Sequence, residues 1–207
     1  MNFNKQVEKE HYSFNRYFYS GRWMSYFYQI KIILELKPKS LLEVGPGTDL
    51  LKFMLNNHVS ELDYKSLDIA RDLNPDIVSS ATKMPLEDNS FDVVCAFQVL
   101  EHLDYQDSLK ALSEMTRVSK KFVLVSLPYS AAELSFSVKI PFLPRGQFFV
   151  RIPYPIKHFF DGQHYWELGR KGYSLKRVRK DFQKIIKIKN EFTPFENQYH
   201  RFYVLEK

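Results

Sequence analysis

Hydrophobic positions along the chain follow two alternating patterns. Short apolar runs that predict strands cover residues 40–45, 62–68, 76–79, 91–97, 122–127, 184–191 and 199–205. Between them, apolar residues recur at three- and four-residue spacing, most clearly in a helix ending at Lys37 and in a helix over 107–119. Strands that alternate with helices in this way predict an α/β fold with a central, mostly parallel, seven-stranded sheet and helices on both faces.

Three shorter segments are also expected to be helical, and they cover residues 48–56, 162–170 and 174–182. Thr48 or Asp49 can cap the first of these helices, because a side-chain oxygen accepts hydrogen bonds from the free N–H groups of a first turn. The stretch 141–155 is expected to be irregular, since four of its residues are proline.

Charge is unevenly distributed along the chain. Its 207 residues include 30 Lys and Arg against 24 Asp and Glu, a formal net charge of +6. Residues 1–136 carry 15 basic and 18 acidic side chains (net −3), whereas residues 137–207 carry 15 and 6 (net +9). A basic end of this kind fits nucleic acid, an acidic membrane surface, an anionic substrate or simply a solvated helix face.

Composition narrows the setting in which the protein works. The single cysteine, Cys95, excludes an internal disulfide framework and a cysteine-based zinc site. No run of about 18 apolar residues is present, so no membrane-spanning helix is expected. The polar start of the sequence, Met1–Lys5, lacks the apolar core of a signal peptide. These features predict a single-domain protein of the cytoplasm.

The first candidate site is a glycine turn, Glu43–Asp49 (EVGPGTD), at the end of the first predicted strand. Gly45 and Gly47 lack a Cβ and let the backbone approach a ligand closely. Ligands of open α/β sheets bind outside the carboxyl ends of the strands. A dinucleotide fingerprint would have its third glycine where Leu50 stands, and no Gly-Lys-Ser/Thr phosphate loop is present. A ligand without a pyrophosphate is therefore favoured.

The second candidate is Asp68, which lies 21 residues beyond Gly47 at the end of the second predicted strand. A carboxylate at this place can accept two hydrogen bonds from the vicinal hydroxyls of a ribose. The alternative is a surface acid near the start of a helix.

Further motifs follow in the order of a known enzyme family. Together with the Glu43–Asp49 loop they are Ser66–Ile69 (SLDI), Met84–Asp92 (MPLEDNSFD) and Val99–Leu103 (VLEHL). With this set, residues 38–130 resemble the class I S-adenosylmethionine-dependent methyltransferases of type 11, the group that includes ubiquinone and menaquinone biosynthesis methyltransferases. The resemblance implies a Rossmann-like methyltransferase fold, a methyl-transfer activity, and S-adenosylmethionine as cofactor.

The resemblance also implies roles for individual residues. Glu43 would fix the glycine loop and the methionyl end of the cofactor, with Gly45 and Gly47 pressed against it. Asp68 would bind the ribose hydroxyls, and Ile69 would pack on the adenine. The other implied cofactor residues are Ala81, Thr82 and Met84 at the adenine, and Phe97 and Gln98 facing the sulfonium and the substrate. Two positions depart from the family pattern, which has glycine at Asp49 and aspartate at Ser80.

On the same grounds the chain divides into four parts of one methyltransferase domain. These are an N-terminal cap helix region (1–37), a cofactor-binding core (38–130), a substrate-side segment that forms an insertion or lid (131–172), and C-terminal strands (173–207).

Two histidines are candidate catalytic residues. A sulfonium methyl group is already activated, so the protein must align the acceptor and exclude water. A base is needed only where the acceptor loses a proton. His102 follows the fourth predicted strand and His164 lies in an aromatic, His-rich run; either could be structural instead. No compact spacing of ligand residues predicts a metal site.

Aromatic residues gather on both sides of the core, with 10 of the 33 in residues 1–30 and 9 in residues 136–166. They either pack the outer helices or form an aromatic lid over the substrate. The lid would draw on Tyr17, Tyr19, Arg22 and Trp23 from one side and on Phe148, Phe149, Arg151 and Trp166 from the other. The candidate substrate contacts among them are Tyr19, Arg22, Trp23, Arg151 and Trp166.

The sequence therefore predicts a methyltransferase that acts on a small-molecule acceptor, anionic or saccharide-like, by in-line displacement. An RNA-directed methyltransferase is one alternative, suggested by the basic run Lys176–Lys180. It is disfavoured because the fourth strand is not followed by the Asn/Asp-Pro-Pro-Tyr/Phe motif of base-amino methylation. A non-catalytic, methyltransferase-like partner protein is the other alternative, suggested by Asp49 and Ser80.

Overall fold

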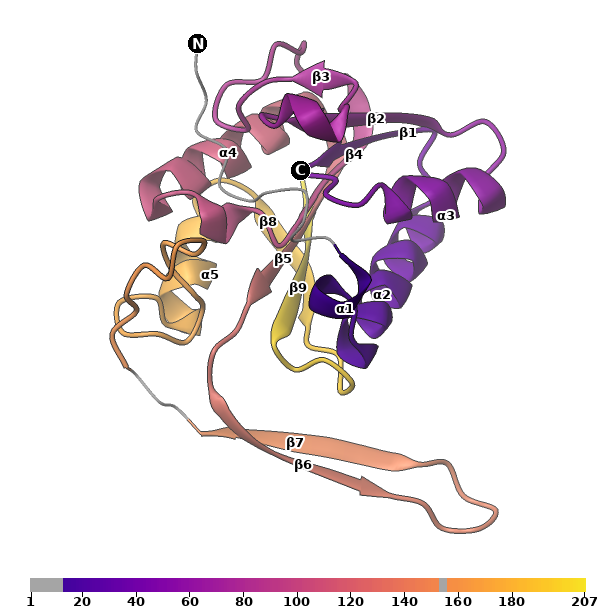
Figure 1. Ribbon diagram of the computed structural model, residues 1–207, viewed down its shortest axis with the longest axis vertical. Coiled ribbons are helices and arrows are strands. Elements are labelled where there is room, and N and C mark those ends of the chain that lie inside the picture. Colours follow the sequence, from indigo (N-terminus) through magenta and orange to yellow (C-terminus); the bar gives the residue numbers. More distant parts are fainter. Residues whose placement is uncertain (1–12, 153–155) are drawn as a thin grey trace.

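The computed structural model describes residues 13–152 and 156–207. A seven-stranded sheet forms its centre, with the strand order β3-β2-β1-β4-β5-β9-β8 (Figure 1). The strands are β1 Ser40–Val44, β2 Asp63–Asp68, β3 Ile77–Val78, β4 Phe91–Phe97, β5 Ser119–Pro128, β8 Lys187–Phe192 and β9 His200–Glu206. The first five are parallel, and β9 pairs antiparallel with both β5 and β8. The predicted seven-stranded, mostly parallel sheet is confirmed.

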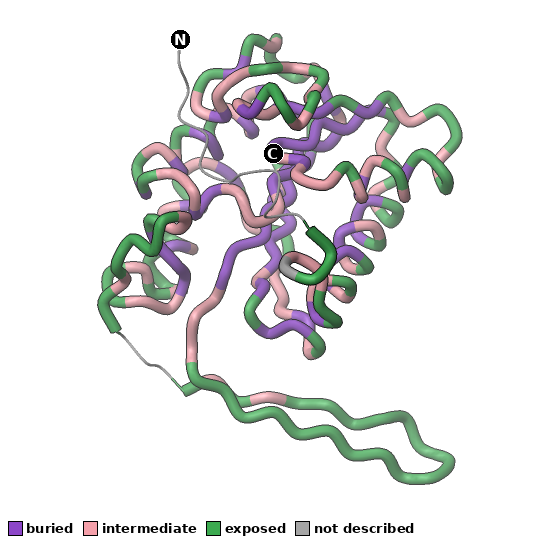
Figure 2. Tube along the Cα trace, in the orientation of Figure 1, coloured by how far each residue is buried: buried purple, intermediate pink, exposed green. Residues whose placement is uncertain are grey.

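Helices cover both faces of the sheet. The helices are α1 Phe14–Tyr17, α2 Ser20–Leu36, α3 Leu50–His58, α4 Tyr105–Val118 and α5 Leu175–Gln183, with short 3-10 turns at η2 Arg71–Leu73 and η3 Leu100–His102. Successive residues of β4 point to opposite faces, so Cys95 packs with α2 and α3 whereas Val94 packs with α4 and α5. Figure 2 shows the resulting layering, with the buried strands between half-buried helices.

The glycine turn and the helix after it differ in detail from the sequence expectation. Asp49 is the N-cap residue of α3, but neither it nor Thr48 caps the helix with its side chain. Asp49 instead adopts a left-handed backbone conformation with φ 55°, and the Thr48 hydroxyl bonds the Tyr26 hydroxyl at 3.0 Å. A side-chain cap that was not predicted is present at α5, where the Ser174 hydroxyl accepts from the backbone N–H of Arg177.

The stretch after β5 forms a hairpin, and the prediction of an irregular 141–155 was wrong for residues 146–152, which form a strand. Strands β6 Ala132–Val138 and β7 Gly146–Ile152 pair antiparallel over seven positions, from Ala132–Ile152 to Val138–Gly146. The prolines of 139–145 lie in the turn, where no strand pairing is lost. Residues 153–155, which complete the predicted stretch, lie outside the described residues.

The predicted helix over residues 162–170 was also wrong. The segment is a series of bends and turns that includes a parallel bridge between Leu168 and Tyr129. Gly169 has φ +91°, and a Cβ at this position would lie 2.4 Å from the carbonyl oxygen of Ser130. Contact with the end of β5, rather than local helical spacing, therefore determines the backbone here.

In the part of the chain that the structure describes, no helix has the length and the apolar character that a bilayer crossing requires.

Candidate active site

The glycine loop lies where β1 ends, between β2 and β4. Gly45 has φ 69° and donates its N–H to the carbonyl of Leu67 at 2.9 Å. A Cβ on Gly45 would lie 2.6 Å from the Val99 side chain, so only glycine lets the segment after β4 approach this closely. Gly47 also has a positive φ, 62°. The loop thus packs against the segment that follows β4. This is the edge of the sheet at which the sequence predicted a ligand site.

Glu43, the last acid of β1, is buried and accepts a hydrogen bond from the hydroxyl of Tyr64. Burial raises its pKa to about 8, with a further contribution from the charge of Asp49, while Tyr64 and Lys52 act in the opposite direction. A cation bound near Glu43 would favour the ionised form of this carboxyl group and lower its pKa.

Asp68, at the end of β2, is half-buried and close to the glycine loop in the sheet. Its Oδ1 accepts the backbone N–H of Ala70 at 2.8 Å, which holds the carboxylate at the strand end. Burial raises the pKa of Asp68, and the bonds from the amides of Ile69 and Ala70 counteract this. Ile69 is half-buried next to it. Asp68, the predicted ribose acceptor, therefore lies at the carboxyl end of β2 with its carboxylate held by a backbone amide.

Residues 80–88 form the next wall of this edge. Ala81 and Met84 are buried, and the Ser80 hydroxyl accepts the backbone N–H of Thr82 at 3.2 Å and bonds its hydroxyl at 2.9 Å. Ser80, where the family has aspartate, thus closes a local turn.

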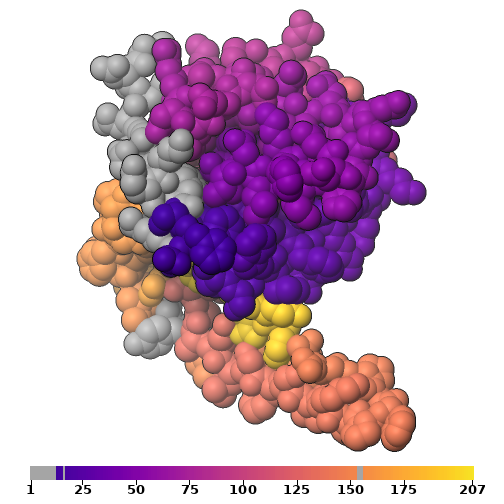
Figure 3. All heavy atoms as spheres, turned by 45° about the vertical axis from the view of Figure 1, so that its right-hand side comes forward, coloured from indigo at the N-terminus to yellow at the C-terminus, as the bar shows by residue number. Residues whose placement is uncertain are grey.

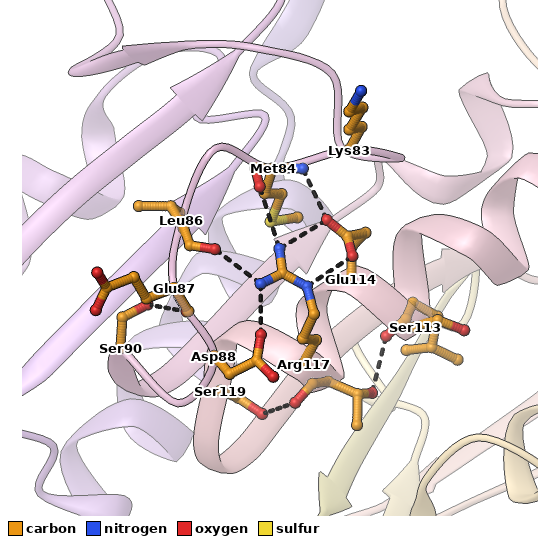
Figure 4. A network of polar contacts seen from close by, with 12 residues as sticks. Lys83, Met84, Leu86, Glu87, Asp88, Ser90, Ser113, Glu114, Arg117 and Ser119 are labelled. Atoms are coloured by element: carbon orange, nitrogen blue, oxygen red, sulfur yellow. Dashed lines mark hydrogen bonds and ion pairs between the residues drawn. The ribbon is translucent and has the colours of Figure 1, made fainter.

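Arg117 of α4 holds this wall in place (Figure 4). Its guanidinium donates to the carbonyls of Met84 and Leu86, at 3.1 and 2.7 Å, and to the carboxylate of Asp88 at 2.7 Å. Glu114 pairs with Arg117 at 2.8 Å and accepts the N–H of Met84 at 2.8 Å. Sequence reasoning missed Arg117 and Glu114, because their contacts link a helix to a loop about 30 residues earlier.

The end of β4 turns sharply into the candidate site. Phe97 packs against Phe202 with ring centroids 6.1 Å apart. Gln98 has φ 59°, an uncommon conformation for a side-chain-bearing residue, and its amide donates to the Ser126 hydroxyl at 3.1 Å. The strain redirects the chain at once into η3, which carries Glu101 and His102.

Two histidines and two glutamates form a cluster directly beyond this turn. His102 Nδ1 bonds the carbonyl of Gln163 at 3.0 Å, and His164 Nδ1 bonds Glu167 Oε1 at 2.9 Å. The two imidazole rings meet edge-to-face with centroids 5.0 Å apart. Glu101 is fully buried, and neither carboxylate oxygen has a hydrogen-bond partner among the described residues. The structure therefore brings together the two predicted catalytic residues, His102 and His164.

The electrostatics of the cluster centre on the His164–Glu167 pair. Burial alone would lower the pKa of His164, but the bond to Glu167 and the charges of Glu101 and Asp161 outweigh it and raise the pKa. Burial opposes ionisation of Glu167, yet bonds from His164 and from the Tyr199 hydroxyl, at 2.7 Å, lower its pKa to about 2. Glu167 is thus a fixed anion that orients His164 and favours its imidazolium form.

Glu101 is the one member of the cluster whose charge is strongly opposed. Burial raises its pKa to about 7, and the positive charge of His164 only partly offsets that effect. Its backbone carbonyl accepts the N–H of Tyr165 at 2.9 Å, which ties η3 to the segment that carries His164.

The start of α2 borders the cluster from the N-terminal side. The charge of Arg22 acts on Glu101 and on His200, and its guanidinium lies 4.1 Å above the Tyr17 ring and 5.5 Å above the Tyr19 ring. Ser25 of the next turn bonds His200 Nδ1 at 2.8 Å. Burial lowers the pKa of His200 to about 3, so His200 is a neutral structural residue.

The other predicted substrate contacts are distributed differently. Trp166 was a wrong prediction: its side chain is fully buried, and its Nε1 donates to the carbonyl of Leu100 and to the Ser108 hydroxyl. Arg151 lies at the base of the hairpin, where it donates to the carbonyl of Gln198. Trp23 is half-exposed and stacks on Phe18 at 5.1 Å. Of the predicted aromatic lid, the Tyr17–Trp23 side borders the cluster.

The other side of the predicted lid lies on the hairpin, which extends outward from the body as a separate arm (Figure 3). Phe148 and Phe149 are both strand residues of β7, and they lie on opposite faces of the hairpin. The expectation of a single lid that closes from both sides is therefore corrected: the hairpin does not fold back over the cluster in this structure.

Glu101, His102 and His164 each offer a ligand atom within 4.8 Å of the others, as do Asp161, His164 and Glu167. Two imidazoles and a carboxylate can ligate a divalent transition metal. The spacing of these residues in the sequence gave no sign of this arrangement. The Nδ1 atoms of both histidines already make hydrogen bonds, which also fits a cluster that holds no metal. A chelation experiment distinguishes a metal site from such a cluster.

An apolar groove of about 700 Å³ lies elsewhere, between α2 and α3. Phe27, Leu34 and Met54 are among its lining residues, and none of the cluster residues lines it. The chemistry-bearing groups and this groove are therefore separate features.

Comparisons with known proteins agree with this geometry. Residues 42–124, less than half of the chain, match the sequence family described as a methyltransferase domain. Over these residues the chain is similar to that family. The match includes the glycine loop, Asp68, residues 80–88 and the end of β4. The family uses S-adenosylmethionine, and the protein is an S-adenosylmethionine-dependent methyltransferase. A search of curated proteins found no match.

Solved structures share the methyltransferase fold over most of the chain. A protein from Pyrococcus horikoshii has a TM-score of 0.59 at 14% identity, with 95% of each chain covered. An S-adenosylmethionine-dependent methyltransferase from Clostridium acetobutylicum has a TM-score of 0.57 at 9% identity, again with 95% of each covered. A 1,6-didemethyltoxoflavin N1-methyltransferase from Burkholderia thailandensis, with its small-molecule substrate bound, has a TM-score of 0.59 at 8% identity, covering 90% of this chain and 80% of that one.

Proposed function

We propose that this methyltransferase acts on a small-molecule acceptor that carries an ionisable O–H or N–H group, and that His164 is the general base. The observation that supports this most strongly is the bond between half-buried His164 and buried Glu167, beside Glu101 and His102, which directly follow the end of β4. In this arrangement a histidine is oriented by a fixed carboxylate at the edge of the sheet where ligands of this fold bind. We further propose that the protein works in the cytoplasm, where a free thiol such as buried Cys95 stays reduced.

The cofactor site follows from the same edge. The residues of the chain suit the cofactor, because the Gly45 turn and the fixed Asp68 carboxylate leave backbone and acceptor groups at neighbouring strand ends. We assign the methionyl end to Glu43, Gly45 and Gly47 and the ribose to Asp68. The adenine side is assigned to Ile69, Ala81, Thr82 and Met84, and the reacting end to Phe97 and Gln98. When bound, S-adenosylmethionine supplies an electrophilic methyl group on a sulfonium.

The proton chemistry is assigned to His164. Its Nδ1 faces Glu167, which leaves Nε2 as the atom that takes the acceptor proton when the ring is neutral. Tyr199 donates to the same Glu167 carboxylate and keeps it from turning away. Because the pKa of His164 lies above 6.5, its usual value, the neutral ring forms only as the pH rises through that higher value. Turnover should therefore increase with pH above about 6.5, where the unperturbed imidazole titrates.

An anionic acceptor is favoured by Arg22. Its Nε is buried without a hydrogen-bond partner among the described residues, and its charge faces Glu101 at the N-terminal border of the cluster. A buried guanidinium N–H without a partner is costly, and an acidic or hydroxyl-rich group of the acceptor would satisfy it.

The basic run of α5 gives the RNA alternative little support. Arg177 and Lys184 both pair with Asp181, at 3.7 and 2.7 Å, and Arg179 pairs with Glu191. These acids neutralise part of the charge that would otherwise face a nucleic acid backbone.

The deciding experiment is a screen of metabolite extracts and total RNA with methyl-labelled S-adenosylmethionine. We expect label in the small-molecule fraction. Label in RNA, with retention that falls steeply with salt, would establish the RNA-directed alternative instead. Calorimetry with S-adenosylhomocysteine distinguishes both enzyme hypotheses from the non-catalytic alternative. A protein that does not bind the cofactor gives no heat at millimolar ligand, and that result would support the non-catalytic alternative. A chelator should leave the label unchanged, whereas a loss restored by Zn²⁺ or Mn²⁺ would replace the His164 base with a metal centre.

A further inference from the structure

The β6–β7 hairpin presents one wholly apolar face to solvent. Strand alternation and the Leu134–Val150 and Phe136–Phe148 register place the apolar side chains together. The set comprises Leu134, Phe136, Val138, Phe148, Val150 and Ile152, each between 45% and 56% exposed. Figure 2 shows the hairpin as the longest continuous exposed stretch of the described chain. A monomer seldom leaves an apolar face of this extent without a partner.

The turn of the hairpin extends this face and adds positive charge. Ile140, Phe142 and Leu143 are all exposed, and Phe142 is fully so, at 104%. Lys139 and Arg145 flank them on either side. Residues 134–150 contain these two cations and no Asp or Glu. The outer hairpin is therefore both apolar and cationic.

The turn satisfies some of its backbone polar groups internally and lacks others. Pro141 and Pro144 have no N–H to leave unsatisfied. The N–H of Leu143 is donated to the carbonyl of Ile140 at 3.2 Å, and the Lys139 ammonium donates to the carbonyl of Leu143 at 2.7 Å. Polar backbone groups buried away from water must be paired in this way.

The base of the hairpin fixes its direction relative to the site. Ser135 and Gln198 exchange hydrogen bonds, at 3.0 and 2.6 Å. Arg151 pairs with Glu133 at 3.6 Å and lies 3.8 Å above the Tyr129 ring. The hairpin continues directly from the carboxyl end of β5, the edge that bears the cluster (Figure 1).

We propose that the β6–β7 hairpin is a docking arm that inserts Ile140, Phe142 and Leu143 into the surface of an anionic phospholipid bilayer, with Lys139 and Arg145 at the headgroups. Apolar side chains at a membrane surface partition into the boundary of headgroups and acyl chains, and neighbouring Lys and Arg add attraction to anionic lipid. The charge pattern favours lipid over a second copy of the chain, since a tip with two cations and no acid offers no complementary charge to its own equivalent.

Co-sedimentation of the full chain with phospholipid vesicles tests the arm. We expect binding to phosphatidylglycerol-containing vesicles, weaker binding to phosphatidylcholine alone, and loss of binding as salt increases. The double variant Phe142→Glu, Leu143→Glu should lower the partition coefficient by about tenfold or more. The variant Lys139→Ser, Arg145→Ser should lower it by roughly tenfold on anionic vesicles only.

A matched control is Phe53→Glu, which changes an equally apolar, 65% exposed residue on α3 and should leave vesicle binding unchanged. For a direct readout, Phe142→Cys labelled with an environment-sensitive dye should report an apolar medium on vesicles, because Cys95 is buried and stays unlabelled. Vesicle binding that is unchanged in the tip variants would overturn the proposal. So would a dimer in solution that the tip variants convert to monomer. Neither outcome depends on catalytic activity.

Discussion

The proposed cofactor-binding core (38–130) and the proposed substrate-side segment (131–172) hold their candidate functional groups by different means. In the core, Glu43 and Asp68 end two parallel strands, and sheet register alone brings them to one edge. In the substrate-side segment, His164 lies in a loop and is positioned by side-chain bonds to Glu167. The proposed cofactor site is thus positioned by secondary structure, whereas the proposed base depends on tertiary contacts. Different substitutions should therefore disrupt each of them.

The largest expected effect comes from removing the anchor of the substrate-side segment. Trp166 is fully buried against Tyr105 and Tyr173, and its indole N–H bonds Leu100 and Ser108. Trp166→Ala should lower the free energy of unfolding by about 3–5 kcal/mol, as truncation of a buried aromatic ring does.

Denaturant titration measures this loss. Trp166→Phe serves as the matched variant, because it keeps most of the ring volume but loses the indole N–H, and it should cost about 1–3 kcal/mol. Equal, small losses in both variants would contradict the view that this residue anchors the segment.

The second effect concerns pH and the orphan carboxyl of Glu101. Its pKa in the folded protein is about 7, above the value of 4.5 for an exposed glutamate. Between these two pH values the folded state binds more protons than the unfolded state, so the free energy of unfolding falls as pH rises. Glu101→Gln cannot ionise and should gain at least about 1.4 kcal/mol at pH 8 relative to wild type, the value of one pKa unit.

Thermal or denaturant unfolding at pH 5 and pH 8 would show this gain only at the higher pH. Glu87→Gln, at an exposed position, is the control. If the wild-type protein and Glu101→Gln lose stability in parallel from pH 5 to pH 8, the carboxyl of Glu101 is already ionised in the fold.

The third and smallest effect belongs to the core. Asp49 has φ 55°, and its charge contributes to the raised pKa of Glu43. Asp49→Gly restores the family residue at a left-handed position and should stabilise the fold by about 1 kcal/mol or less. The same change should lower the pKa of Glu43. Ser60→Gly, in the exposed loop after α3, is the control for a general effect of glycine; a destabilised Asp49→Gly would mean that the carboxylate has a structural role.

The sequence predicted the two regions with unequal success, for physical reasons. Strands such as β4 are buried on both faces and therefore appear in the sequence as nearly continuous apolar runs. Their bounds were predicted to within a few residues for this reason. The hairpin was missed because its apolar face covers no core and the prolines of its turn dominate the pattern. The helix predicted over 162–170 was wrong because the burial of Trp166 and the close approach at Gly169 override local spacing.

The candidate site divides in the same way. Glu43, Gly45 and Asp68 could be placed from the sequence, since each lies at or near the carboxyl end of a predicted strand. Glu167 and Tyr199 could not, because their hydrogen bond links positions 32 residues apart that share no element. Glu101 was overlooked because a buried, unpartnered carboxyl cannot be recognised without its surroundings.

The central claim, that the core binds the cofactor while the substrate-side segment supplies the base, is tested most directly by a pair of variants measured in both assays. Asp68→Asn should weaken cofactor affinity by about 1–3 kcal/mol through lost charged hydrogen bonds. His164→Ala should leave that affinity unchanged in calorimetry and lower kcat by about 10²-fold or more. The controls are Asp63→Asn and His58→Gln, both at exposed positions. Full turnover in His164→Ala, or cofactor affinity unchanged in Asp68→Asn, would contradict the division of roles.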